Sequence, residues 1–181
     1  MLLIGHIKSN GVIIMYDKIT QKDVQRMLDE IEHRKLVIRK EAIKDVQEAR
    51  AHGDLSENFE YKAAKQFKNQ NESRIRYLER MIKTAKIISE DSNDDEVGLN
   101  DKVTFYLPED DTEETLKIVT TVRSNATKGR ISIDSPLGKA MLRHKVDDKV
   151  SVKVNESYSY DVIIRKIEKL EDDMTDELLK H

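Results

Sequence analysis

The feature that most constrains this chain is a single break between two long helix-forming stretches. In the first stretch, apolar residues recur at alternating three- and four-residue steps, the spacing of a coiled-coil seam. These residues are Val24, Leu28, Ile31, Ile38, Ala42 and Ala49. Lys35 and Asp45 interrupt the seam, and Thr20 with Asp23 has the form of a capping box with Asp in place of Glu. We therefore expect a helix over about residues 20–50, roughly 45 Å long at the usual rise per residue.

A second stretch of similar length follows Gly53. Its seam positions are Tyr61, Ala64, Lys68, Asn71, Ile75, Leu78, Ile82 and Ala85, and neither proline interrupts either stretch. Two equal legs joined at a glycine predict an antiparallel helical hairpin over residues 16–89, with an acidic tip at 53–58. The alternative is a helix pair within an ordinary bundle. Because no third and fourth amphipathic helix follows, the pattern favours a projecting hairpin.

After an acidic linker expected at 90–98, the apolar pattern changes to a period of two. Five segments then read as strands: 102–107, 115–120, 129–133, 149–154 and 159–165. Between the third and fourth, residues 135–142 predict a short helix with Pro136 in its first turn. The predicted fold class is α+β, a long antiparallel coiled-coil hairpin followed by a compact, mainly antiparallel β domain at 99–170.

Both ends of the chain lie outside these two units. Met15 directly precedes the first patterned segment, so residues 1–15 are expected to be a start-site extension. Residues 171–181 form a charged tail in which Met174, Leu178 and Leu179 stand at helical spacing. A frayed terminal helix is the expectation for this tail, in preference to a docking segment.

Composition limits the partners and the location. The net charge of -3 argues against broad attraction to nucleic acid or to an anionic membrane, so any nucleic-acid contact should be local. With 37% charged and 5% aromatic residues, the chain suits long solvated helices better than one large core. The lack of cysteine excludes disulfides and thiolate metal sites. No signal-peptide pattern or apolar run of membrane-spanning length occurs, and we expect a cytoplasmic protein.

Two carboxylates at the break are the strongest candidates for chemistry. Asp54 and Glu57 are three residues apart, a spacing that can direct both side chains the same way. In one interpretation they cap the second helix, because carboxylates satisfy free N–H groups at a helix start. In the other they are ligands of Mg²⁺, which usually takes one or two protein carboxylates and completes its shell with water and phosphate oxygens. Such a half-site would act only inside another macromolecule.

Two segments resemble one known family. Residues 48–58 read EARAHGDLSEN and are followed by Glu60-Tyr61 and by AAK at 63–65, which closely resembles the tip of the bacterial GreA/GreB transcript cleavage factors. Residues 129–140 read GRISIDSPLGKA and resemble the signature of the C-terminal domain of that family. The resemblance covers about residues 16–170. It implies an N-terminal coiled coil and an FKBP-like C-terminal domain.

The resemblance also implies a function. Members bind bacterial RNA polymerase at the rim of its secondary channel and pass the coiled coil toward the active centre. There the tip carboxylates, here Asp54 and Glu57, help hold a second Mg²⁺ and position a water, so that polymerase cuts the backtracked RNA near its 3′ end. The protein itself would not be an enzyme and would hold no metal tightly when isolated. Neither a membrane nor a small-molecule substrate is expected.

Position within the resemblance suggests further roles around the tip. Ser56 and Asn58 are candidates to contact the water or, equally, to support the turn by local hydrogen bonds. Tyr61 is expected to pack in the seam beneath the tip, with contact to the RNA end as the alternative. Lys65 would lie near the RNA, within a strip of basic residues that could contact backbone phosphates. The alternative is that this strip is simply a solvent-exposed helix face. The other members of the strip are Lys62, Lys68, Arg74 and Arg76.

In the C-terminal half the resemblance implies a polymerase-docking loop made by Asp134, Ser135, Pro136 and Leu137. The alternative is that Ser135-Pro136 simply begins a helix. An FKBP-like fold also suggests a peptidyl-prolyl isomerase, but the chain has no tryptophan and few aromatic residues to line a proline pocket.

Three residues depart from the family pattern. Phe59 stands where a small residue is common, and Arg143 and Asp147 replace frequent glycines. The leading hypothesis is a transcript cleavage factor. The alternative is a regulator that occupies the same channel and inhibits polymerase without cleavage, and a third is an interaction module unrelated to transcription. The two carboxylates in the Gly-Asp-Leu-Ser-Glu-Asn context favour cleavage.

Overall fold

The computed structural model describes residues 17–51 and 58–179. The predicted extension at 1–15 and the tip residues Asp54, Ser56 and Glu57 therefore lie outside the described residues. The helices are α1 (Gln21–His33), α2 (Arg39–Ala51), α3 (Phe59–Thr84) and α4 (Pro136–Met141), and a π-helical turn at Arg34–Ile38 joins α1 to α2. The strands are β1 (Lys18–Ile19), β2 (Lys86–Ile87), β3 (Lys102–Leu107), β4 (Thr112–Val119), β5 (Arg130–Ser132), β6 (Lys149–Lys153) and β7 (Ser159–Glu168).

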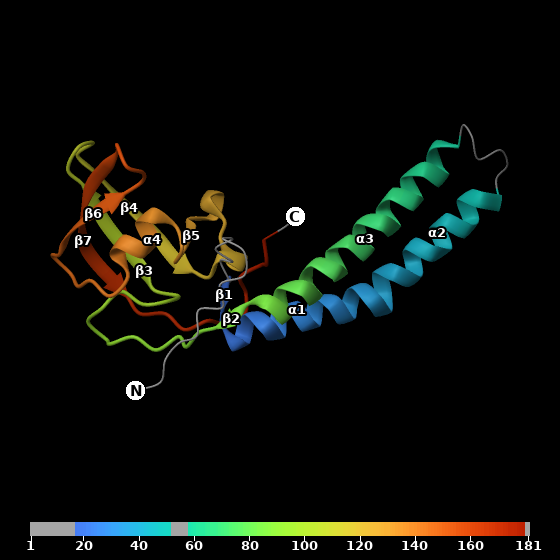
Figure 1. Cartoon of the computed structure of the whole chain (residues 1–181), viewed down its shortest axis with the longest axis horizontal. Coiled ribbons are helices and arrows are strands. Elements are labelled where there is room, and N and C mark those ends of the chain that lie inside the picture. Colours follow the sequence, from blue (N-terminus) through green and yellow to red (C-terminus); the bar gives the residue numbers. More distant parts are fainter. Residues whose placement is uncertain (1–16, 52–57, 180–181) are drawn as a thin grey trace, which may run out of the picture.

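The two helical legs form the predicted hairpin, with α1 and α2 as one leg and α3 as the other (Figure 1). The capping box is present, because Thr20 Oγ1 accepts from the Asp23 N–H at 3.1 Å and Asp23 Oδ2 accepts from the Thr20 N–H at 3.0 Å. The α3 seam is confirmed as well. Its buried or half-buried positions are Tyr61, Ala64, Lys68, Asn71, Ile75, Leu78, Ile82 and Ala85.

The first leg corrects one seam position. Leu28 is 46% exposed, whereas Met27 is only 1% exposed and packs in the core at the hairpin base. Because Ile31 can be reached from Val24 through either residue, periodicity could not choose between them. The π-helical turn lies where polar residues interrupt the seam, and its wider turn accommodates one extra residue. Beyond it the seam resumes, with Ala42 and Ala49 buried.

The β domain is one five-stranded sheet in the order β5-β4-β3-β7-β6. Its pairs are antiparallel except β4 and β5, which run parallel. The α+β prediction is confirmed with this one parallel pair added. Between β4 and β5 the chain makes two short 3-10 turns, at Thr121–Arg123 (η2) and Ala126–Lys128 (η3). This longer connection returns β5 in the direction of β4, which a two-residue hairpin cannot do.

Helix α4 packs on the core of the sheet through Met141, which is fully buried with Phe105 and Ile164. Gly138 permits this packing, because a Cβ there would lie 2.2 Å from the Ser132 carbonyl oxygen. Val97, within the predicted linker at 90–98, is also fully buried in this core.

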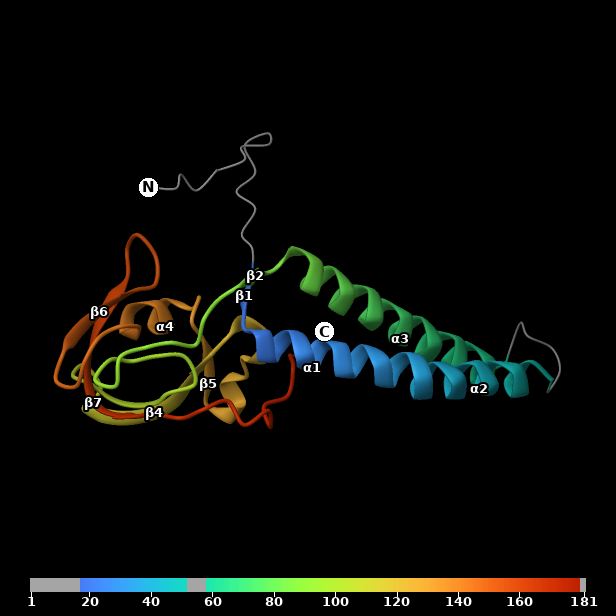
Figure 2. The same cartoon turned by 90° about the horizontal axis from the view of Figure 1, so that it is seen from below.

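A second core lies where the hairpin meets the β domain. Residues from α1 and α3 pack there with Val122 of η2, and β1 pairs in parallel with β2 beside them. From this junction the hairpin extends away from the sheet in both views (Figures 1 and 2). No helix in the described part of the chain is long and apolar enough to cross a membrane.

The expectation of a frayed terminal helix is wrong for the described part of the tail. Residues 171–179 carry no helix and run back along the junction between the hairpin and the β domain. Helical spacing in so short a segment is a weak local preference, and the ion pairs that its carboxylates make with both domains outweigh it.

Candidate functional site at the distal end of the hairpin

The distal end of the hairpin is defined by two helix ends. Helix α2 ends at Ala51 and α3 begins at Phe59, and both ends lie far from the β domain (Figures 1 and 2). The candidate pair Asp54 and Glu57, with Ser56, belongs to the connection between these ends. The prediction that this pair assists a metal therefore stays untested by the described geometry.

Asn58 is the described residue that organises this end. Its Oδ1 accepts from the Tyr61 N–H at 2.9 Å, which makes it the N-cap of α3. Its Nδ2 donates to the Ala49 carbonyl oxygen at 2.9 Å, which ties the start of α3 to the last turns of α2. One side chain therefore caps one leg and links it to the other. This geometry supports the local role predicted for Asn58, and contact with a water stays a prediction.

Two aromatic rings carry lysines just beyond the cap. Phe59 is 82% exposed, and the Lys62 Nζ lies 5.6 Å from its ring centroid. Tyr61 is half-buried in the seam, as predicted, and the Lys65 Nζ lies 6.0 Å from its ring centroid. Such cation–π contacts at exposed sites are weak, about 0.5–1 kcal/mol, so both ammonium groups remain available to phosphates.

The predicted basic strip divides into two sets. At about 100° per residue, Lys62, Lys65 and Arg76 lie on one exposed face of α3. Lys68 occupies a half-buried seam position, and Arg74 projects from another face. Three of the five cations thus share a face of α3, with Arg76 eleven residues, roughly 16 Å, beyond Lys65 along the helix.

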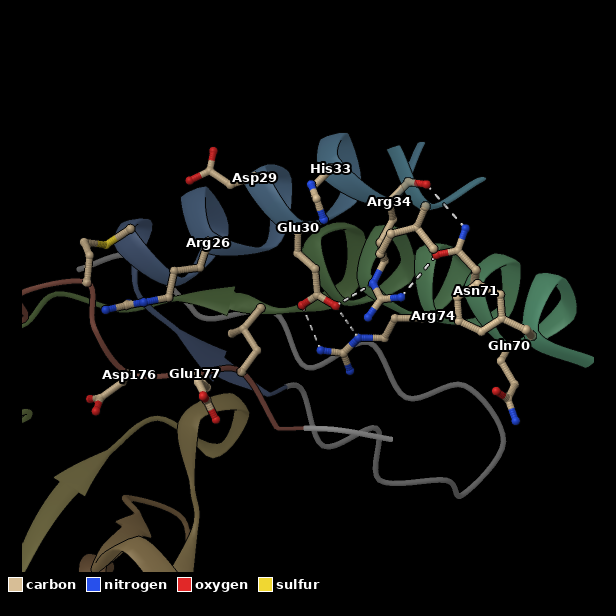
Figure 3. Close-up of a pocket in the computed structure, with 14 residues that line it drawn as sticks. Arg26, Asp29, Glu30, His33, Arg34, Gln70, Asn71, Arg74, Asp176 and Glu177 are labelled. Carbon is tan, nitrogen blue, oxygen red and sulfur yellow. Dashed lines mark hydrogen bonds and ion pairs between the residues drawn. The ribbon is translucent and has the colours of Figure 1, made fainter. Parts of the chain in front are cut away.

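Arg74 is engaged at the base of the hairpin, in an open groove between the two legs and the tail (Figure 3). Its Nε lies 2.9 Å from Glu30 Oε1, which also accepts from Arg34 Nε at 2.7 Å. Arg74 Nη1 donates to the Leu179 carbonyl oxygen at 2.8 Å. Burial alone would raise the pKa of Glu30, but the hydrogen bonds from Arg74 and Arg34 outweigh it and lower the pKa. These internal contacts occupy the guanidinium, and an RNA contact by Arg74 stays a prediction.

The predicted docking loop precedes α4. Ser135 is the N-cap, with its Oγ accepting from the Gly138 N–H at 3.1 Å, and Pro136 occupies the first turn. Asp134 accepts from Lys18 Nζ at 3.2 Å, and Leu137 packs partly against the β-domain core. The helix-start role is therefore present, and docking to polymerase stays a prediction.

A buried charge network at the junction was missed from the sequence. Asp23 lies 2.7 Å from Arg123 Nε and also accepts from Thr120 Oγ1 at 2.7 Å. Asp172 accepts from Arg26 Nη1 at 2.7 Å and lies 3.4 Å from Arg123 Nη1. The Thr20 capping box pointed to Asp23, but nothing local marked the arginines or Asp172 as its neighbours.

Both domains match family models. Residues 17–87 match "Transcription elongation factor, N-terminal", and residues 91–169 match "Transcription elongation factor, GreA/GreB, C-term". The tail described above follows the end of the second match.

Curated relatives are similar over most of their length. The transcription elongation factor GreA of Bacillus subtilis is 42% identical over 133 residues, 74% of this chain and 85% of the relative. GreA of Mesomycoplasma hyopneumoniae (strain 7448) is 38% identical over 152 residues, 83% of this chain and 95% of the relative. A solved structure of the GreA factor homolog Gfh1 of Thermus thermophilus is 28% identical and covers 86% of this chain and 100% of its own, at a TM-score of 0.39. The two matched domains and these identities make this chain a member of the GreA/GreB family of transcription elongation factors.

Proposed function

We propose that this chain binds bacterial RNA polymerase in its secondary channel and stimulates cleavage of the backtracked RNA 3′ end. The β domain docks at the channel rim, and the hairpin reaches toward the active centre of polymerase. The chain is a cytoplasmic factor with no independent nuclease activity. Its contribution is the carboxylate pair Asp54 and Glu57.

The projecting hairpin is the observation that carries this proposal. Helix α3 has 26 residues, so its leg reaches about 39 Å from the junction. Its distal end lies away from the β domain in both views (Figures 1 and 2). Had the hairpin folded back on its own domain, the segment that joins the legs could not enter a channel.

The donor set of the connecting segment suits Mg²⁺ held jointly with a partner. Two carboxylates match the number that Mg²⁺ usually takes from protein, and the remaining positions would go to water, RNA and polymerase. When bound, such an ion supplies charge stabilisation and an activated water for phosphodiester hydrolysis. Asp54 and Glu57 would supply the protein ligands of this ion, and Asn58 holds the two helix ends together through its bonds to Ala49 and Tyr61.

A cleavage assay on backtracked complexes tests the proposal. Wild-type protein should release short 3′ RNA fragments in Mg²⁺, and Asp54→Asn with Glu57→Gln should reduce cleavage to the level of polymerase alone. The matched control is Asp45→Asn with Glu48→Gln, which removes two exposed carboxylates from α2. This control should cleave like the wild type.

The same assay separates the other hypotheses. Unchanged cleavage by the Asp54/Glu57 double variant would refute the role of the pair. Slower elongation with no fragments would identify an inhibitory channel regulator. Failure to bind core polymerase in a pull-down would indicate an interaction module unrelated to transcription.

A further inference from the structure

The described part of the tail, residues 171–179, contacts both domains at once. On the hairpin side, Asp172 accepts from both terminal nitrogens of Arg26, at 2.7 Å for Nη1, and its carbonyl oxygen accepts from Lys22 Nζ at 3.0 Å. Further along, the Leu179 carbonyl oxygen accepts from Arg74 of α3 at 2.8 Å. The tail is therefore bonded to both legs of the hairpin.

On the β-domain side, Asp176 is the main contact. It accepts from Arg130 Nη1 at 2.6 Å and from Lys117 Nζ at 2.9 Å, on β5 and β4 respectively. The Leu179 N–H donates to the Val122 carbonyl oxygen at 2.7 Å. Figure 3 shows Asp176 and Glu177 on the tail beneath α1, which places the segment between the two domains.

Charge balance makes the tail part of the junction. Arg26 of the hairpin and Arg123 of the β domain are nearly buried, with side-chain exposures of 7% and 0%. Asp23 pairs with both of them, and Asp172, also fully buried, supplies the second carboxylate. Without Asp172, the buried guanidinium groups of Arg26 and Arg123 would share Asp23, with Asp176 at the edge of the network. Because buried charge without a partner is costly, this arrangement favours separation of the two domains.

The length of the hairpin makes the junction angle decisive at its tip. With α3 about 39 Å long, a rotation of about 10° at the base moves the distal end by about 7 Å. Ligand oxygens in a catalytic site must be held to within about 0.5 Å. Two direct contacts also join the domains. Lys18 pairs with Asp134 at a half-exposed position, and Asp23 pairs with Arg123 in the buried network that Asp172 completes.

We propose that the tail is a positioning segment that fixes the angle between hairpin and β domain, with Asp172 and Asp176 as its positioning residues. Its consequence for cleavage rests on the proposed function, whereas its effect on the angle does not. The tail lies beyond the match to the C-terminal family model, which ends at residue 169.

A distance measurement on the full chain tests the angle directly. The chain has no cysteine, so spin labels can be placed at Asn69→Cys on α3 and Glu156→Cys in the β6–β7 loop, both exposed positions. The test variant is Asp172→Asn. The matched control is Asp173→Asn, the neighbouring exposed carboxylate, whose hydrogen bonds among the described residues are to Thr175 within the tail.

Wild type and Asp173→Asn should give one narrow distance distribution, and Asp172→Asn should give a distribution at least twice as broad. An equally narrow distribution for Asp172→Asn would overturn the proposal. Should Asp172→Asn fail to fold, Asp176→Asn releases the tail from β4 and β5 at a less buried position and must broaden the distribution in its place.

Cleavage supplies the second readout. Asp172→Asn should bind polymerase with unchanged affinity but stimulate cleavage several-fold less, because only the reach of the tip has changed. A broadened distribution with unchanged cleavage would refute the functional consequence of the tail while leaving the role of Asp54 and Glu57 intact. Refutation of the proposed function would give a different result, namely cleavage that persists in the Asp54/Glu57 double variant.

Discussion

At the residue scale, the two residues that we expect to replace family glycines have a clear backbone consequence. Arg143 and Asp147 adopt positive φ angles of 69° and 70°, the region that favours glycine. Arg143 has compensating contacts, with a hydrogen bond to the Asp91 carbonyl oxygen at 3.3 Å. The Asp147 side chain is 82% exposed, and its nearest cation, Arg165, is 4.0 Å away. Asp147 therefore retains backbone strain with little gained in return.

Asp147→Gly should stabilise the protein by roughly 0.5–1 kcal/mol, because glycine adopts positive φ without a Cβ clash. The urea midpoint should rise with an unchanged slope. Asp147→Ala is the control and should lower the midpoint, since alanine lacks the local hydrogen bonding that lets Asp tolerate this region. A stabilising alanine would contradict the backbone explanation.

Asp172 gives a prediction on pH. Burial alone would raise its pKa, but the hydrogen bonds from Arg26 and the Met174 N–H and the charge of Arg123 outweigh it and lower the pKa from 3.8 to about 2. Since the folded pKa lies below the unfolded value, the stability from ionised Asp172 is present above about pH 4 and is lost as pH falls toward 2. The shift corresponds to roughly 2 kcal/mol.

Urea unfolding from pH 5 to pH 2 measures this effect. The free energy of unfolding of the wild type should exceed that of Asp172→Asn at pH 5, and the difference should shrink by about 2 kcal/mol at pH 2. Carboxylates far from Asp172 titrate alike in both proteins and cancel in the difference. A constant difference across this range would show that the Asp172 charge does not stabilise the fold.

At the scale of elements, the distal end of the hairpin depends on one side chain. Asn58→Ala removes the cap of α3 and the link to the Ala49 carbonyl oxygen, at a cost of about 1–2 kcal/mol locally. Amides in the first turns of α3 should exchange with solvent about tenfold faster or more. The melting temperature should change little, because few contacts with either core lie there.

Asn58→Asp separates the two bonds. The carboxylate can still cap α3 but cannot donate to Ala49, so exchange should be faster than in wild type and slower than in Asn58→Ala. If both variants exchange like the wild type, Asn58 does not hold this end of the hairpin together.

At the scale of the whole molecule, Arg123 joins the two domains through three carboxylates. Its partners are Asp23 at 2.7 Å, Asp176 at 3.2 Å and Asp172 at 3.4 Å. Arg123→Leu leaves this buried negative charge without its central cation, which should cost about 3–5 kcal/mol.

The hairpin and the β domain should also cease to unfold together in this variant. On unfolding, helical circular dichroism and the NMR signals of the β-domain tyrosines should change together in wild type and should give two separate transitions in Arg123→Leu. Arg76→Leu removes an exposed arginine of α3 and is the control, with unfolding expected to remain close to that of wild type. Coincident transitions in Arg123→Leu would argue that the apolar contacts of Val122 suffice to couple the domains.

The elements themselves were readable from local patterns. The Thr20 capping box, the α3 seam and strand β3 follow from neighbouring residues, and the structure has them where periodicity and capping placed them. The choice of Met27 over Leu28 was not readable, because it depends on which side of α1 meets Val122. Asp54 and Glu57 lie outside the described residues, so their metal-assisting role stays a prediction from the family resemblance.

The sequence by itself determined the two units, their order and the polar break between the helical legs, because these depend on interactions within a few residues of chain. Only the tertiary structure decided the parallel pairing of β4 with β5 and the return of the tail to the junction. The pairing of Asp172 with Arg26 joins residues 146 positions apart. The energy of a buried ion pair depends on desolvation and on neighbours from other segments, and no local pattern contains that information.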